Sequence, residues 1–324
     1  MEITLQIDEL KALLKSAGPG VKTTSLDQLL TWGQLVTFPQ NTAEEILLST
    51  FGISGNAAFY TAIADELRPS SSDYWMRADP VSLQAGMSRV FLVASGSPEF
   101  PEQQRAALQD SLNLHFAEDG LQFLLPNNNR WYIHLDSGHP QAQTELLPPP
   151  RKLLGEDISI DTAVMGKFWQ RCFTEIQMLL FAQPHRQDRE IRGQSPISGL
   201  WLWGGGLPGS GPEPERELNC SGNSALLQGL ALSAESAWQA EANISTASKQ
   251  LIHWAGDQPG TAVEQLKQLE DQVFSPLLEA VSNGAELTFI AADAGRWTVR
   301  KRLKWPWKKQ AGARVIVLES AIHE

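Results

Sequence analysis

The chain has 324 residues, of which 42% are hydrophobic and 19% are charged, and its formal net charge at pH 7 is −11. This length accommodates one large α/β domain or two smaller ones, with enough apolar residues for a core. The acidic balance excludes a general nucleic-acid binder, and no stretch approaches the roughly 18 uninterrupted apolar residues of a membrane-spanning helix, so neither kind of partner is expected.

The cellular compartment is predicted from cysteine content and from the first residues. Cys172 and Cys220 are the two cysteines, too few for a disulfide framework and suited to a reducing compartment. The opening residues Met-Glu-Ile-Thr-Leu-Gln-Ile-Asp lack the basic and apolar regions of a secretory signal. We therefore expect a cytoplasmic protein.

The first half of the chain is predicted to contain helices and a small α+β unit. Thr42 is a helix N-cap residue, and Pro101 suits the first turn of a helix that Gly120 ends. Alternating apolar residues on either side of an Asn-Asn-Asn turn predict a β-hairpin. The predicted helices cover 42–49, 57–67 and 101–118, and the predicted strands cover 89–95, 121–125 and 131–135.

The second half is predicted to return to helix-rich α/β structure and to end in strands. A Pro-Pro-Pro spacer at 148–150 precedes a helix with an apolar stripe at helical spacing. The C-terminal strands alternate and are separated by turns, which predicts a β-meander. The predicted helices cover 161–182, 223–239 and 261–282, and the predicted strands cover 197–203, 251–255, 286–291, 296–304 and 314–319.

The stretch from Pro184 to Gly206 is the strongest candidate for a binding site. Arg186 and Arg189 lie in a segment too polar for a core, and the short apolar strand that follows ends in a triple glycine, 204–206. Arginines and a glycine loop at the end of a buried strand indicate an anion site in an α/β sheet. The Gly-Lys-Ser/Thr ending of a P-loop is absent, so an ordinary strand-to-loop turn is the competing interpretation.

Two further arginines have the same ambiguity. Arg77 lies between aromatic residues and an Asp-Pro turn, so it is either a fork for an anion or a structural partner of Asp79. Arg130 opens the return strand of the predicted hairpin, and it too is either an anion-binding residue or a structural one.

Metal and catalytic motifs are not recognisable. The segment His134-Leu135-Asp136-Ser137-Gly138-His139 contains metal-ligating residue types, but a zinc site requires three or four convergent ligands, so we interpret it as surface polar residues. No Gly-x-Ser-x-Gly nucleophile elbow occurs. The sequence therefore predicts no catalytic residues and no metal ligands.

The C-terminal strand 296–304 and the residues after it form a basic patch on an acidic protein. The patch either binds phosphate or an acidic protein partner, or protects an edge strand by its charge. Its members are Arg296, Arg300, Arg302, Lys304, Lys308 and Lys309.

Five segments together resemble a known family. Residues 73–83 (Asp-Tyr-Trp-Met-Arg-Ala-Asp-Pro-Val-Ser-Leu), 129–133, 175–180, 189–193 and 200–206 (Leu-Trp-Leu-Trp-Gly-Gly-Gly) resemble proteobacterial proteins described as cofactor-independent phosphoglycerate mutase-like or as regulators of pathogenicity factors. The central stretch is also similar to archaeal-type cofactor-independent mutases of the alkaline phosphatase superfamily. The resemblance covers most of residues 73–285.

The resemblance implies a fold and a domain arrangement. It implies an α/β protein with an alkaline phosphatase-like core sheet, an inserted smaller α+β domain and a C-terminal β-meander. The implied boundaries are 1–74 for the first part of the core, 75–183 for the insert, 184–284 for the second part of the core, and 285–324 for the meander.

The resemblance also implies which residues contact a ligand. In the mutases an Asn, an Arg, a Gly and a second Asn help to hold the substrate phosphate; the Arg and Gly match Arg189 and Gly193, whereas Arg186 and Ser198 replace the asparagines. Arg77 matches another substrate-facing arginine. We predict as ligand-binding residues Arg77, Arg186, Arg189, Ser198, Gly204, Gly205 and Gly206, and we add Arg130 from its place in the predicted hairpin.

The metal motifs of the mutases are missing. Neither the early Asp-Gly motif nor the late Asp-His-Gly motif is found, and two-metal phosphoryl transfer requires such ligands. The sequence therefore predicts a non-catalytic or regulatory binder of a small phosphorylated or carboxylated metabolite, without a cofactor. Two alternatives stay open: an active mutase or phosphatase with two divalent metals, and a protein-interaction module that uses the basic patch.

Overall fold

The computed structural model describes residues 1–324 except for 38–40, 87–88, 97–99, 143–146, 160–164, 183–195, 209–210, 257–259, 302–316 and 318–324. The chain forms two compact units. The larger unit comprises residues 1–54 and 211–324, and the smaller unit comprises residues 55–210. The chain therefore leaves the larger unit once and returns to it.

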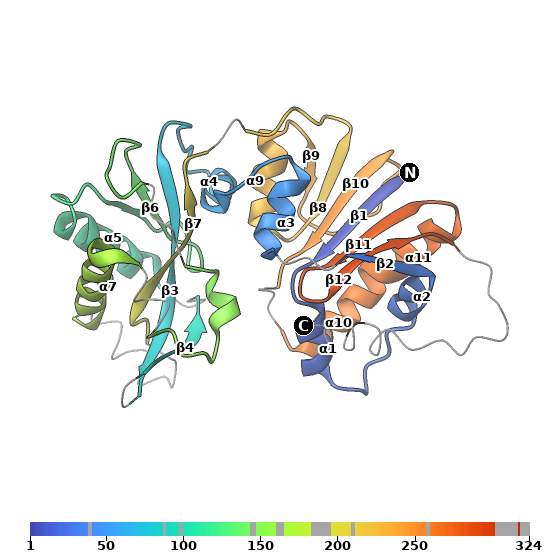
Figure 1. The fold of residues 1–324 in the computed structure, drawn as a ribbon, viewed down its shortest axis with the longest axis horizontal. Helices are drawn as coiled ribbons and strands as arrows, with labels where there is room; N and C mark the ends of the chain where they lie inside the picture. The colour runs from blue at the N-terminus through green and yellow to red at the C-terminus, as the bar shows by residue number, and fades with distance from the viewer. Residues whose placement is uncertain are drawn as a thin grey trace. The chain divides into compact units, whose positions relative to one another are not determined.

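The larger unit contains a seven-stranded mixed sheet in the order β2-β12-β11-β1-β10-β8-β9 (Figure 1). β1 lies between β11 and β10 and is parallel to both, and β8 and β9 continue the parallel part. β12 is antiparallel to β11 and to β2. The strands are β1 (Glu2–Ile7), β2 (Gly33–Thr37), β8 (Leu218–Gly222), β9 (Ala237–Gln239), β10 (Lys249–Trp254), β11 (Glu286–Ala291) and β12 (Gly295–Val299).

Helices cover both faces of this sheet, as a sheet with parallel strands requires. Figure 1 shows α3 (Ala43–Thr50) and α9 (Ala225–Ser233) on one face. The other face packs against a larger set of helices, and the apolar residues of β1, Ile3, Leu5 and Ile7, are fully buried beneath them. This set comprises α1 (Leu10–Ala17), α2 (Thr24–Trp32), α10 (Ala262–Leu269), the π-helical turn η2 (Glu270–Phe274) and α11 (Ser275–Ser282).

The smaller unit is built on β3 (Tyr74–Ala85), which pairs with three strands, all antiparallel. The strand β7 (Gly199–Gly206) runs along one side, while β6 (Tyr132–Leu135) and β4 (Val90–Ser95) occupy opposite ends of the other side. β5 (Gln122–Leu124) completes the predicted hairpin with β6. The first residues of β3 therefore lie beside the last residues of β6 and β7.

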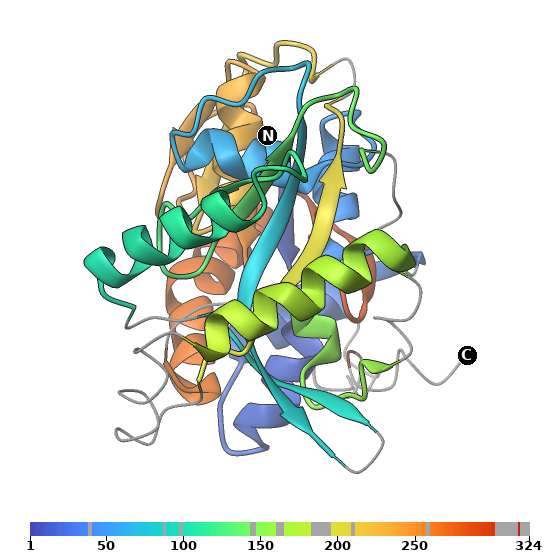
Figure 2. The ribbon, with the colours of Figure 1, turned by 90° about the vertical axis from the view of Figure 1, so that its left-hand side faces the viewer.

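The smaller sheet has helices on both faces. Figure 2 shows α5 (Glu102–His115) and α7 (Gly166–Phe181) crossing one face, where they bury an aromatic-rich core. The helix α4 (Ala57–Ala64) packs against β3 and β7, and a short 3-10 helix η1 (Pro150–Leu153) lies next to β4. The predicted α/β class with an inserted smaller α+β unit is confirmed.

Some predicted elements are corrected. The strand at the centre of the sequence, β7, was expected in the core sheet, but its hydrogen bonds are to β3 in the smaller unit. The end of the helix predicted over 223–239 is the strand β9, which pairs with β8. In the predicted meander, β11 and β12 pair as expected, but β12 takes β2 as its other neighbour. Of the predicted strand 314–319 only Val317 is described, and it is helical.

The two cysteines are buried, one in each unit, and make no disulfide. Burial raises the pKa of the Cys172 and Cys220 thiols to about 12, so the reactive thiolate is scarce at neutral pH. We expect alkylation by iodoacetamide at pH 8 to be slower by at least about 100-fold than in the unfolded chain. Peptide mass spectrometry checks each site; rapid labelling of the folded protein would contradict this expectation.

Within the described residues, the helices are all too short or too polar to cross a membrane.

Candidate functional site

A buried polar region of the smaller unit is centred on Arg77 of β3. Its Nε and Nη2 donate to Asp79 Oδ1 over 2.9 and 2.6 Å, and Trp203 Nε1 donates to Asp79 Oδ2 over 2.7 Å. The guanidinium carbon lies 5.5 Å from the Tyr132 ring centroid and 5.1 Å from that of Trp203. Arg77 is therefore paired, enclosed by aromatic rings and almost completely buried.

The environment of Asp79 is set by burial. Burial is the largest influence and raises the pKa of the Asp79 carboxyl above its ordinary value, while Arg77 and the Trp203 hydrogen bond act in the opposite direction. A carboxylate this deep is stable only because each of its oxygens accepts hydrogen bonds. This geometry corresponds to the structural interpretation of Arg77.

Arg130 belongs to a second, adjoining pair. Its Nε donates to Asp65 Oδ2 over 2.9 Å, and its Nη2 donates to Asp65 Oδ1. Tyr132 also donates its hydroxyl proton to Asp65 Oδ2 over 2.6 Å, and burial raises the pKa of that phenol. The ring of Tyr132 faces Arg77 while its hydroxyl group faces Asp65, so the two arginine pairs form one network.

The other predicted ligand-binding residues that the structure describes lie toward opposite ends of the smaller sheet. Gly204, Gly205 and Gly206 end β7 beside the first turn of α4, at the same end of the sheet as Arg77. A Cβ at Gly206 would lie 3.4 Å from that of Asn56, an ordinary van der Waals distance, so packing against Asn56 does not require glycine there. Ser198 lies toward the opposite end, where its Oγ accepts from Leu83 N over 2.7 Å.

Arg186 and Arg189 lie outside the described residues. The structure thus brings together Arg77, Arg130 and the triple glycine, and it separates Ser198 from them.

The two histidines of the segment 134–139 contact different parts of the smaller unit. A ring nitrogen of His139, Nε2, lies 2.9 Å from the carbonyl oxygen of Asp119, and Gln141 N donates to the other nitrogen, so His139 has a local structural role. His134 instead turns toward Asp73, which precedes β3. The sequence interpretation missed Asp73, because only the pairing of β3 with β6 brings it within reach.

In the larger unit, the carboxyl ends of the parallel strands hold a closed polar pair. His253 Nε2 lies 2.7 Å from Asp8 Oδ1, and both side chains are 4% exposed. Gln6 Nε2 donates to Asp8 over 3.3 Å and to the carbonyl oxygen of Ala43 over 2.8 Å. Asp293 Oδ2 accepts from Ala12 N over 2.9 Å and so caps α1. Each of these side chains is held by at least one hydrogen bond within the unit, although Gln6 Oε1, His253 Nδ1 and Asp293 Oδ1 are buried and make none within the described part of the chain.

A centre for two metal ions requires several ligand side chains that converge on one place. Among the described residues of the larger unit, no three His, Cys, Asp or Glu side chains come together. The 2.7 Å separation of Asp8 and His253 is a hydrogen-bond distance and leaves no space for a cation between them. The residues described there do not fit a two-metal phosphoryl-transfer site.

A small cavity also lies at the carboxyl ends of the parallel strands of the larger sheet. Its volume is about 210 Å³, and it is lined by Ile7, Trp254, Gly256 and residues of α1 and α10, with Glu9, Ser16 and Gln265 as polar members. Ligands bind in such crevices in open α/β sheets. The Glu9 carboxylate and the apolar walls do not suit an anion.

The basic C-terminal patch is described only in part. Arg300 pairs with Glu286 at 3.0 Å, and Lys301 Nζ donates to the carbonyl oxygen of Ser282 over 2.9 Å. Arg302, Lys304, Lys308 and Lys309 lie outside the described residues. Of the two described members, Arg300 thus pairs with a carboxylate of the same unit, and Arg296 is exposed.

Comparison with solved structures shows a shared fold. The PH0037 protein from Pyrococcus horikoshii matches with a TM-score of 0.52 and 12% identity, over 97% of this chain and 91% of that chain. A cofactor-independent phosphoglycerate mutase from Thermoplasma acidophilum matches with a TM-score of 0.43 and 13% identity, over 98% and 97%. The first likeness establishes the fold alone, and the second is too low to carry an argument.

No protein-family model matches the sequence, and no curated protein sequence is significantly similar to it. Function therefore has to be argued from the geometry of the chain itself.

Proposed function

We propose that the chain binds a small phosphorylated or carboxylated metabolite through Arg77, Arg130 and the backbone near Gly204–Gly206, and that it does not catalyse phosphoryl transfer. The observation that carries the proposal is the way both guanidinium groups are held. Each donates to a carboxylate from its Nε and Nη2 nitrogens. The carboxylate occupies one edge of each guanidinium and fixes its plane, so a planar anionic ligand would bind at another edge.

Access differs between the two arginines. The Arg130 side chain is 30% exposed, so a ligand can reach it from solvent. Arg77 is deeper, with 8% of its side chain exposed, and Nη1 makes no hydrogen bond within the described part of the chain. A ligand would therefore meet Arg130 first. Arg186, Arg189 and Ser198 remain predicted contacts, and the position of Ser198 makes it the most distant of the described ones.

The non-catalytic part of the proposal depends on the donor groups of the larger unit. Phosphoryl transfer by two metals requires ligands that clamp the attacking and leaving oxygens. The described side chains there form an Asp8–His253 pair and a cap of α1 by Asp293 instead. The sequence also lacks the early Asp-Gly motif and the late Asp-His-Gly motif of the mutases that it resembles.

Calorimetric titration with 3-phosphoglycerate tests the binding. We expect the unaltered chain to bind it and Arg130→Lys to bind at least about tenfold more weakly, because lysine loses the bidentate fork. Arg216→Lys is the matched control, since Arg216 pairs with Glu235 on the surface of the larger unit. Failure to bind 3-phosphoglycerate, phosphate or citrate, or equal binding by Arg130→Lys, would refute the binding site.

An enzyme assay tests the proposal that the chain does not catalyse phosphoryl transfer. We expect no interconversion of 3- and 2-phosphoglycerate, with or without added manganese. Conversion that a chelator abolishes would overturn the non-catalytic assignment and leave the binding result standing.

A further inference from the structure

We propose that Asp73, His134 and Asp136 form a binding site for one divalent transition-metal cation such as Zn²⁺. The three residues lie at the end of the smaller sheet where β3 begins and β6 ends. One ligand atom from each lies within 4.8 Å of those of the other two. The site does not depend on the metabolite binding proposed above.

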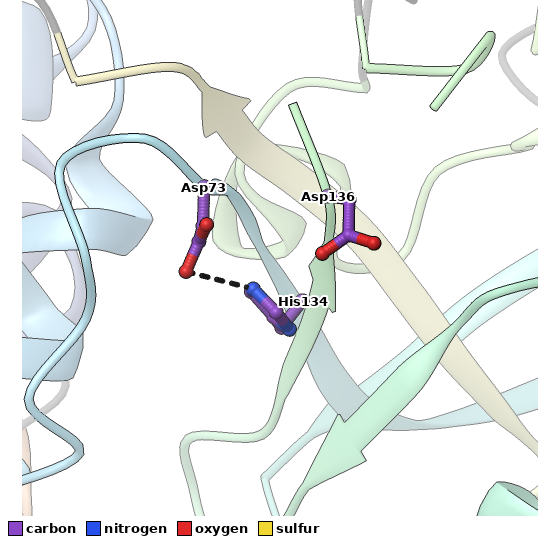
Figure 3. A group of neighbouring side chains, drawn as sticks. All are labelled: Asp73, His134 and Asp136. Atoms are coloured by element: carbon purple, nitrogen blue, oxygen red, sulfur yellow. Dashed lines mark ion pairs between the residues drawn. The ribbon is translucent and has the colours of Figure 1, made fainter. Parts of the chain in front are cut away.

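The three side chains reach this point from two segments far apart in sequence. Asp73 immediately precedes β3, His134 is in β6, and Asp136 follows the last residue of β6. The antiparallel register pairs Tyr74 with Leu135, which places the three residues around one point. Figure 3 shows the Asp73 carboxylate directed at His134 and the Asp136 carboxylate beside them.

The Nε2 atom of His134 is the strongest indication of a cation. It is buried and makes no hydrogen bond, although Asp73 Oδ2 lies 3.1 Å away. Two ligands about 2.1 Å from one metal ion lie about 3.0–3.4 Å apart at octahedral or tetrahedral angles. The nitrogen-to-oxygen distance of 3.1 Å fits two ligands on a shared ion, and it also fits a direct ion pair when no cation is bound.

Neighbouring groups hold the proposed ligands in the orientation that metal binding needs. Gln122 Oε1, a carbonyl acceptor, lies 3.1 Å from His134 Nδ1, which places the proton on Nδ1 and the lone pair on Nε2. Ser72 donates its hydroxyl proton to Asp73 Oδ1 over 3.0 Å, leaving Oδ2 to face His134. Metal-binding side chains are usually held by hydrogen bonds of this kind from groups that do not touch the ion.

The chemistry of the ligands selects the kind of cation. One imidazole and two carboxylates suit zinc and its first-row neighbours, whereas magnesium and calcium prefer all-oxygen sites. Asp136 is exposed, so its side chain can move to complete the site. Three protein ligands leave further coordination positions open to water or to an anionic group.

Calorimetric titration of the full chain with zinc chloride tests the site. We expect one zinc ion per chain and no comparable binding of magnesium. His134→Ala and Asp136→Asn should weaken zinc binding by at least about 100-fold, and Gln122→Ala by about 10- to 100-fold, because the imidazole loses its orienting partner.

His139→Ala is the matched control, since it removes a histidine five residues away that bonds elsewhere. Its zinc affinity should equal that of the unaltered chain. Because Asp136 is exposed, Asp136→Asn leaves the fold intact even if His134→Ala does not. The proposal is overturned if the chain binds no zinc, or if Asp136→Asn and Gln122→Ala bind it with unchanged affinity.

Discussion

Replacement of Arg77 by methionine is expected to destabilise the smaller unit by about 3–5 kcal/mol, because it leaves the Asp79 carboxylate buried without its ionic partner. Urea unfolding followed by circular dichroism gives the free-energy difference, and labelling of Cys172 shows that the smaller unit has opened. The loss should shrink at acidic pH. Because burial raises the pKa of Asp79, the carboxyl is protonated in the folded state as the pH falls through that raised value.

A double variant separates the ion pair from the rest of the site. Arg77→Met with Asp79→Leu removes both charges, so we expect it to recover most of the lost stability. Arg216→Met breaks a pair whose side chains are 75% and 54% exposed and should cost no more than about 1 kcal/mol. If Arg77→Met alone costs less than that, the buried pair is not what stabilises this end of β3.

Replacement of Gly222 by alanine is expected to destabilise the larger unit by at least about 3 kcal/mol. Gly222 is the last residue of β8, with φ at +140°, and its partner in β10 is His253. A Cβ there would lie 1.9 Å from the carbonyl oxygen of His253, a distance that backbone atoms cannot accommodate. The two strands must separate, and the Asp8–His253 pair moves with them.

Iodoacetamide labelling of Cys220, two residues earlier in β8, checks this result together with urea unfolding. Gly20→Ala is the control in the same unit, since its added Cβ meets no atom within 4 Å. It should change the free energy of unfolding by no more than about 0.5 kcal/mol. Unchanged stability and an unlabelled Cys220 in Gly222→Ala would contradict the close approach of β8 and β10.

Sequence periodicity predicted the amphipathic elements well. The N-cap residue Thr42 and the turn Asn127-Asn128-Asn129 are local signals, and α3, β5 and β6 follow them. The helix predicted over 261–282 is observed as α10, η2 and α11 in succession. Each of these predictions needed only neighbouring residues.

The strand β3 was missed because its charges and its proline are atypical of a central strand. Arg77 and Asp79 neutralise each other, and Pro80 lacks the N–H that a ladder uses. Its partner β7 was read correctly as a buried strand but assigned to the other sheet, since buried strands of both sheets have the same apolar composition. Which strand pairs with which depends on residues far apart in the sequence, so the apolar pattern of one strand does not reveal its partner.

Only those contacts of the candidate site that join residues close together in the sequence were predicted. Arg77 was identified, together with the possibility that Asp79 is its partner, because the two are adjacent in sequence. The carboxylate opposite Arg130 is Asp65, and the residue opposite His134 is Asp73; both are distant in sequence. Only the folded sheet brings these acids to the basic side chains.

The position of β1 constrains how the chain is made. β1 is synthesised first, but its two neighbours, β10 and β11, are residues 249–254 and 286–291. The whole of residues 55–210 leaves the ribosome before either neighbour exists, so the smaller unit is free to fold during translation. Until then the main-chain groups of β1 have no permanent partner, and a nascent chain stopped before residue 249 would expose them to aggregation.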